Sequence, residues 1–182
     1  QLVKPFADLW DPAKQQNSPE TIFEIQFSSN QPSGRSPAYS FLPSKSEYSG
    51  EASTSARVRI NRETYDYHVA QYPTDPRIAA TYITSYTKAG KTSPTLCYPY
   101  VTLNPTKSGE YWPYLKKYLG TVVGNSSDGN LILLRYADVL LMLAEAENEV
   151  NGPNSGYQYV NEVLARARYI SPNSSAADPA DW

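Results

Sequence analysis

The sequence predicts a mainly α fold with long irregular loops and little sheet, in which a tetratricopeptide-like helical hairpin packs on a loop-rich body. Residues 131–150 form an apolar run that ends at Asn-Gly-Pro, where glycine suits a left-handed C-cap and proline stops the helix. Residues 154–170 carry apolar side chains at helical spacing. Because the link between the two stretches is so short, the helices must lie antiparallel.

The 182 residues correspond to about one domain. We expect a loop-rich body over residues 1–130, the hairpin over 131–170 and the start of a following segment over 171–182. A single helical hairpin cannot bury both of its faces, and no second copy occurs at the repeat period of about 34 residues. We therefore expect one incomplete domain, with the apolar face of the hairpin exposed or covered by another chain.

The first half of the body holds one clear strand. Residues 1–20 are typical of a short helix or turn followed by a loop. In residues 21–27, three apolar side chains alternate with Glu24 and Gln26, which predicts a half-buried strand. Residues 28–57 are rich in serine and have weak periodicity. A loop of this length inside a folded chain is typical of a functional loop.

The second half of the body alternates turns with short segments. Asp75 followed by Pro76 predicts the opening of a helix or turn, because aspartate accepts free backbone N–H groups and proline needs no donor there. Residues 88–114 contain four prolines and indicate loops with short extended pieces. Residues 114–119 fit a helix or a strand equally well.

Composition excludes several classes of function. The chain has 16 basic and 18 acidic side chains, a net charge of −2, and this balance gives no long-range attraction for nucleic acid or anionic lipid. Cys97 and His68 are each the single residue of their type, which excludes an internal disulfide and the multi-cysteine or two-histidine metal sites. We expect no metal, cofactor or nucleic-acid partner, and the roles of these two residues stay open.

Nothing in the sequence indicates catalysis. The chain lacks the Gly-x-Ser-x-Gly elbow and the glycine-rich phosphate loop. Carboxylates at Glu47, Glu51, Glu63 and Asp66 could serve a glycoside hydrolase, but no pairing between them is defined. The 16 tyrosines suit contact with a partly polar partner, or they pack on the domain itself. We therefore expect a protein that is not an enzyme and has no catalytic residues.

Several polar residues fit structural roles. Arg135 and Asp138 are one helical turn apart and are expected to pair with each other or with neighbouring helix ends. Asp75 and Arg77 are expected to fix a turn. Arg166 is expected to pair with glutamates of the facing helix.

Residues 134–146, with the sequence Leu-Arg-Tyr-Ala-Asp-Val-Leu-Leu-Met-Leu-Ala-Glu-Ala, resemble the signature helix of the SusD/RagB family of outer-membrane nutrient-binding lipoproteins. Four further segments follow that family's order: residues 20–27, 75–77, 116–118 and 160–168. Tyr136 stands where the family usually has leucine. Because family members are usually much longer, the resemblance implies an internal or C-terminal-half fragment.

The resemblance also implies a function and a location. Family members capture glycans, or in some cases peptides, at the cell surface and pass them to a SusC-like TonB-dependent transporter. The resemblance thus implies an outer-membrane, surface-exposed protein that attaches to the membrane only through an N-terminal lipid absent from this chain. The alternatives are a peptide-binding member or a structural or protein-interaction module, and then a glycoside hydrolase fragment.

Glycan binding requires flat aromatic rings and a few polar partners, because a sugar presents an apolar C–H face and a rim of hydroxyls. The loop over residues 28–57 offers Tyr39, Phe41 and Tyr48 as rings and Arg35 as a polar partner. Family members commonly carry ligand-contacting aromatics in this region. Trp112, in a proline-rich loop, is the second candidate, whereas the resemblance implies a packing role for Trp10.

Overall fold

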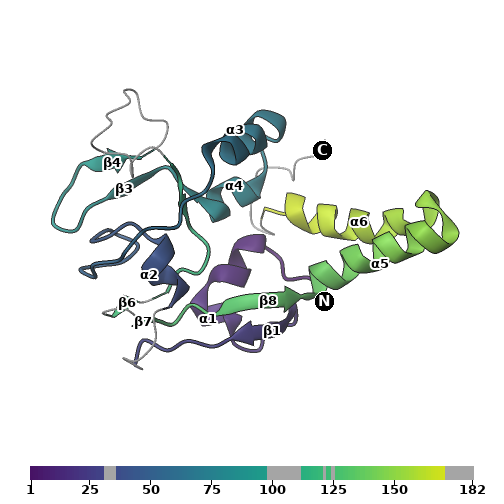
Figure 1. Ribbon diagram of the computed structural model, residues 1–182, viewed down its shortest axis with the longest axis horizontal. Coiled ribbons are helices and arrows are strands. Elements are labelled where there is room, and N and C mark those ends of the chain that lie inside the picture. The colour runs from purple at the N-terminus through teal and green to yellow at the C-terminus, as the bar shows by residue number, and fades with distance from the viewer. Residues whose placement is uncertain (31–35, 98–111, 121, 124–125, 171–182) are drawn as a thin grey trace.

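The computed structural model describes residues 1–30, 36–97, 112–120, 122–123 and 126–170. It shows an irregular body from which a long helical hairpin projects (Figure 1). The N-terminal helices lie where the hairpin meets the body. The predicted fold class is confirmed, since helices dominate and the sheets are small.

The body contains short helices and short strands joined by loops. In chain order its elements are η1 (Phe6–Trp10), α1 (Pro12–Gln15), β1 (Thr21–Ile25), α2 (Pro37–Phe41), α3 (Arg62–Gln71), α4 (Pro76–Thr81), β2 (Tyr82–Ile83), β3 (Ser85–Thr87), β4 (Pro94–Leu96), β5 (Tyr114–Leu115), β6 (Val122–Val123), β7 (Ser126–Ser127) and β8 (Leu131–Arg135). The hairpin consists of α5 (Tyr136–Asn151) and α6 (Pro153–Arg168).

The described strands form four antiparallel pairs, β1 with β8, β2 with β5, β3 with β4, and β6 with β7. In the longest pair, Thr21 lies opposite Arg135 and Ile25 opposite Leu131. The chain passes from β8 into α5 without a loop. The pairing of β1 with β8 therefore fixes where the hairpin leaves the body.

The expectation of one helix over residues 131–150 is wrong at its start. Residues 131–135 form β8, and the helix begins only at Tyr136. A short apolar run fits a strand as well as a helix, and its partner β1 lies more than a hundred residues earlier in the chain. The boundary between body and hairpin therefore falls at residue 136 rather than 131.

The strand predicted over residues 21–27 is present as β1, but it is not half-buried as predicted. Its irregular register contains two shifts, and the side chains of Phe23 and Ile25 are 59% and 44% exposed. A register irregularity breaks the strict alternation of faces on which the prediction rested. Phe23 and Ile25 therefore add little to the core of the described chain.

Helix starts follow local sequence rules. The side chains of Asp11, Asn61 and Asp75 each accept a hydrogen bond from the backbone N–H two positions later, at the starts of α1, α3 and α4. Four of the described helices, α1, α2, α4 and α6, have proline in the first positions, where its missing N–H costs nothing.

The core of the described residues divides into three clusters. One lies in the lobe of α2 and the small strands: Ala38, Leu42, Ile83, Tyr86, Cys97 and Tyr114. A second joins η1 to β8: Phe6, Leu9, Trp10 and Ile132. The third holds the base of the hairpin: Leu2, Ala137 and Leu140. The projecting part of the hairpin thus lies beyond the body's core, as Figure 1 also shows.

Much of the hairpin surface is apolar and exposed. Leu141, Met142, Val150 and Tyr157 are 43%, 52%, 79% and 58% exposed. The sequence led us to expect an exposed apolar face on the hairpin, and these four residues are exposed. Among the described residues, no helix combines the length and the hydropathy needed to cross a bilayer.

The two helices approach each other closely at Gly156. A Cβ atom built on Gly156 would lie 2.6 Å from the carbonyl oxygen of Ala144, inside van der Waals contact. The preceding turn has Gly152 at φ 85°, a conformation that glycine adopts without strain. These two glycines set the turn and the spacing of the hairpin.

We expect Gly156→Ala to lower the free energy of unfolding by about 1 to 2 kcal/mol, because the new methyl group forces the helices apart. Chemical denaturation of the wild type, Gly156→Ala and the exposed control Asn154→Ala measures the effect. A glycine in an open helix would instead gain about 1 kcal/mol on replacement by alanine. A more stable Gly156→Ala variant would therefore contradict the close packing.

Candidate functional site

The segment predicted to carry ligand-binding rings folds as α2 followed by a loop over residues 42–56. The hydroxyls of Ser46 and Ser49 both donate to the carbonyl oxygen of Pro43, at 2.7 Å each. The hydroxyl of Thr54 donates to the Leu42 carbonyl at 2.7 Å, and the backbone N–H of Ser55 donates to the Tyr39 carbonyl at 2.9 Å. These hydrogen bonds give the loop a defined shape. Arg35 lies outside the described residues.

The structure does not gather the three predicted rings into one platform. Tyr39 and Phe41 lie two positions apart on α2, and residues at that spacing do not share a helix face. Phe41 packs on Tyr118, with ring centroids 5.6 Å apart. Tyr48 packs on the core cluster of the α2 lobe, and burial raises the pKa of its hydroxyl. Packing therefore uses part of Phe41 and Tyr48, and all three residues, Tyr39 included, are half-buried.

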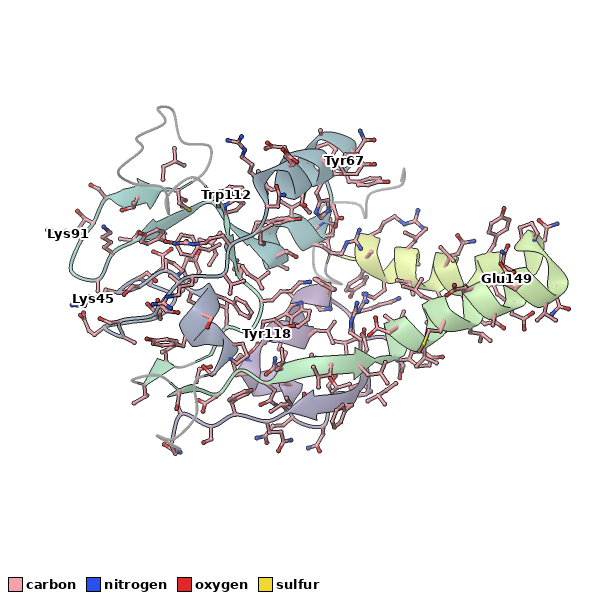
Figure 2. The ribbon with its side chains drawn as sticks, in the orientation of Figure 1. Lys45, Tyr67, Lys91, Trp112, Tyr118 and Glu149 are labelled. Atoms are coloured by element: carbon pink, nitrogen blue, oxygen red, sulfur yellow. The ribbon has the colours of Figure 1, made fainter. Side chains whose placement is uncertain are left out.

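Tyr118 links this segment to the N-terminal helices. Figure 2 shows Tyr118 between α2 and those helices. Its ring meets the ring of Trp10 edge to face at 5.1 Å, and Trp10 meets Phe6 at 5.8 Å. Trp10 is only 7% exposed. It lines a groove of about 440 Å³ beside α4, but with so little of its ring exposed it cannot stack on a sugar.

Trp112 lies on the surface beside α3 (Figure 2). The next two residues, Pro113 and Tyr114, are buried, and the Pro113 carbonyl accepts a hydrogen bond from the N–H of Ile60 at 3.1 Å. The guanidinium carbon of Arg62 lies 5.9 Å from the centroid of the Trp112 ring. A half-buried indole on an anchored backbone, with a cation beside it, offers both an apolar face and hydrogen-bond donors to a sugar.

A buried carboxylate joins α3 to α4. The side chain of Asp75 is 0% exposed, and its Oδ2 lies 2.7 Å from His68 Nε2 and 2.7 Å from Arg77 Nη2. His68 Nδ1 lies 2.9 Å from the hydroxyl of Tyr82. Burial raises the pKa of Tyr82, which makes its hydroxyl a poor nucleophile. Asp75 and Arg77, predicted to fix a turn, pair with each other at the start of α4, and His68 fastens α3 to that helix start.

A second buried carboxylate, Glu20, holds the hairpin to the body. Its oxygens accept hydrogen bonds from Arg166 Nη1 at 2.8 and 3.0 Å, from Arg135 Nη1 at 3.1 Å and from the backbone N–H of Val3 at 2.7 Å. The predicted pairing of Arg166 with glutamates of α5 is therefore wrong. Desolvation lowers the pKa of Arg166 although Glu20 opposes that shift.

Arg135 and Asp138 pair with each other at the start of α5, as expected from their spacing. The backbone N–H of Arg135 donates to Asp138 Oδ2 at 3.1 Å, and Arg135 Nε lies 3.8 Å from the same oxygen. Cys97 is fully buried as a free thiol whose Sγ donates to the Ile83 carbonyl. Among the described residues, no three His, Cys, Asp or Glu side chains are grouped closely enough to hold a metal ion.

The sequence was compared with protein families and with known proteins. The model of the SusD family matches residues 19–181. A SusD-like protein P25 of Formosa agariphila is 47% identical over 60 residues, which are 31% of this chain and 11% of that protein. The chain thus spans a small part of this curated relative.

Solved structures share the fold. A SusD homolog from Bacteroides thetaiotaomicron superimposes with a TM-score of 0.70 at 23% identity, over 100% of this chain and 39% of that one. Surface glycan-binding protein A of the same species, in complex with laminarihexaose, gives a TM-score of 0.60 at 20% identity, over 95% of this chain and 41% of that one. The chain therefore corresponds to about two fifths of these structures.

Proposed function

The chain belongs to the SusD family, and on that basis we propose that its protein binds glycans at the outer surface of the cell without chemically changing them. The observation that carries the proposal is the family match over residues 19–181. The laminarihexaose complex of a protein with the same fold supports the choice of glycan over peptide. The proposal extends to delivery of the glycan to a SusC-like TonB-dependent transporter in the outer membrane.

We propose Trp112 as the main ring of the site in this chain, with Tyr39 as a second contact. Trp112 is half-buried and anchored by buried neighbours, so stacking on it costs little ordering entropy. Arg62 beside the ring can donate hydrogen bonds to sugar hydroxyls. Phe41 and Tyr48 support the loop through packing, and Arg35 stays a proposed polar contact.

The polar groups that join α3 to α4 have structural roles, which favours binding over catalysis. The one described histidine is engaged on both ring nitrogens, with Asp75 and with Tyr82. Asp75 is itself shared between His68 and Arg77. These groups hold α3 in place, and burial raises the pKa of Tyr82, so its hydroxyl is not an activated nucleophile. Binding through one or two rings and a few hydrogen bonds corresponds to an affinity nearer micromolar than nanomolar.

We expect Trp112→Ala to weaken glycan binding about two- to tenfold, the range for losing one stacking contact. Affinity electrophoresis against a glycan panel, followed by calorimetry on the best ligand, measures the change. Tyr157→Ala is the matched control, because Tyr157 is a 58% exposed aromatic residue on the hairpin. Equal retention by Trp112→Ala and wild type would remove Trp112 from the site and leave Tyr39 as the next candidate.

A further inference from the structure

A shallow, open hollow lies at the end of the body away from the hairpin. It has a volume of about 370 Å³, within the range of small-molecule sites. Its walls come from the loop after α2 and from the turn between β3 and β4. The lining residues are Ser46, Glu47, Gly50, Thr87, Lys88, Ala89, Gly90 and Lys91.

The two walls of the hollow are joined by the backbone. Ser46 and Lys88 form an antiparallel bridge. The N–H of Glu47 donates to the Thr87 carbonyl at 3.0 Å, and the N–H of Ala89 donates to the Lys45 carbonyl at 2.8 Å. Ser46 is 1% exposed. The hollow is therefore preformed, and a ligand entering it would pay little to order the loops.

Three lysines surround this hollow. Lys88 and Lys91 line it, and Lys45 lies beside Ala89 through the backbone hydrogen bond. All three residues are exposed, and Figure 2 shows Lys45 and Lys91 along the same outer edge of the body. The chain as a whole carries a net charge of −2, so a local excess of positive charge here differs from the average surface.

The acidic residues nearby do not cancel this charge. Oε2 of Glu47 accepts a hydrogen bond from the N–H of Thr87 at 3.0 Å, which directs that carboxylate to the backbone. Glu51 is exposed on the same loop. Among the described residues around the hollow there are thus three ammonium groups and two carboxylates, and one of the carboxylates already accepts a backbone hydrogen bond.

Two glycines line the hollow. Gly50 has φ 56° and Gly90 has φ 72°, and a Cβ atom built on either would meet nothing within 4 Å. Their positive φ angles favour glycine, so both walls of the hollow turn tightly at these positions.

We propose that this hollow is a subsite for an acidic substituent of the glycan, a sulfate ester or a uronic carboxylate. Lys88 and Lys91 would pair with the anionic oxygens, and Lys45 would add to the local positive potential. The hydroxyl of Thr87 is available to a sugar hydroxyl. The inference rests on the proposed function, and it names the substrate class as acidic glycans.

The test compares matched neutral and acidic polysaccharides. The purified protein is titrated with dextran and dextran sulfate, with hydroxyethyl- and carboxymethylcellulose, and with laminarin and sulfated laminarin. The double variant Lys88→Gln/Lys91→Gln is compared with Lys4→Gln/Lys14→Gln, which removes the same charge from the N-terminal segment. Circular dichroism confirms that both variants are folded.

We expect at least one acidic form to bind more tightly than its neutral partner. Lys88→Gln/Lys91→Gln should weaken that binding about three- to tenfold, as two exposed charge contacts allow, and added salt should reduce the difference. Binding of the neutral form and the behaviour of the control variant should not change. The sulfated and carboxymethylated ligands separate the two kinds of anion.

Three results would overturn the inference. Equal affinity for neutral and acidic forms would remove the acidic subsite and leave the proposed glycan binding intact. Equal losses in the two double variants would show general charge attraction rather than a site. Failure to bind any glycan in the panel would overturn the inference together with the proposed function.

Discussion

Glu20→Gln is expected to lower the free energy of unfolding by about 3 to 5 kcal/mol, because it leaves the buried guanidinium of Arg166 without its counter-charge. The Glu20 side chain is 0% exposed and that of Arg166 only 2% exposed. The same carboxylate also binds Arg135 and the N–H of Val3. One residue thus joins the N-terminal segment, β8 and α6.

Chemical denaturation of the wild type and Glu20→Gln measures this loss, with Glu149→Gln as the control for an exposed glutamate on α5. Hydrogen exchange adds a local test, since amides of α6 should lose protection before those of the α2 lobe. A loss no greater than that of Glu149→Gln would contradict the role of Glu20 as the anchor of the hairpin.

Lys117→Met is expected to stabilise the protein at pH 7 by about 2 kcal/mol. Burial lowers the pKa of Lys117 from 10.5 to about 8, and the charges of Arg135, Arg77 and Arg166 add to this effect. A shift of this size costs the charged lysine about 3 kcal/mol in the folded state. Contacts of Lys117 Nζ with the rings of Trp10 and Phe6, at 4.8 and 5.4 Å, offset part of the cost.

The stabilisation by Lys117→Met should depend on pH with a defined sign. Below pH 8 Lys117 is charged in both the folded and the unfolded state. The folded wild type then carries the full free-energy cost of burying that charge. Between about pH 8 and 10.5 the folded protein releases this proton while the unfolded chain retains it. Because the unfolded state then binds more protons, wild-type stability rises with pH relative to the variant.

Unfolding free energies of both proteins at pH 7, 8, 9 and 10 test this prediction. The advantage of Lys117→Met should be constant up to about pH 8 and shrink towards pH 10. Tyr118, whose pKa is raised by burial, is present in both proteins and cancels in the difference. An advantage that is the same at all four pH values would contradict a buried charged lysine.

The turns and helix starts could be predicted from the sequence, because they are set by residues next to each other in the chain. Gly152 and Pro153 define the turn of the hairpin, and Asp75 with Pro76 defines the start of α4, because turns and caps are set by neighbouring residues. β8 was missed because its apolar run forms a strand only through pairing with β1. Helix α3 was missed because it has no buried residue and no apolar stripe.

The side-chain contacts of the site were harder to predict. Arg166 binds Glu20 across 146 residues of sequence, and no spacing rule distinguishes that partner from the nearer glutamates of α5. Glu20 lies in a segment that supported the family resemblance, yet its burial is a property of the assembled fold. Likewise, the sequence placed Phe41 in a polar loop as a ligand-binding ring. In the structure Phe41 lies on α2 and its ring packs on Tyr118.

Incubation of the purified protein with a panel of glycans, with retained and released sugar measured in the same samples, tests non-catalytic glycan binding most directly. We predict that at least one glycan is retained at micromolar affinity and that no new reducing ends form over prolonged incubation. Absence of retention for every glycan, or release of sugar by the purified protein, would contradict the account.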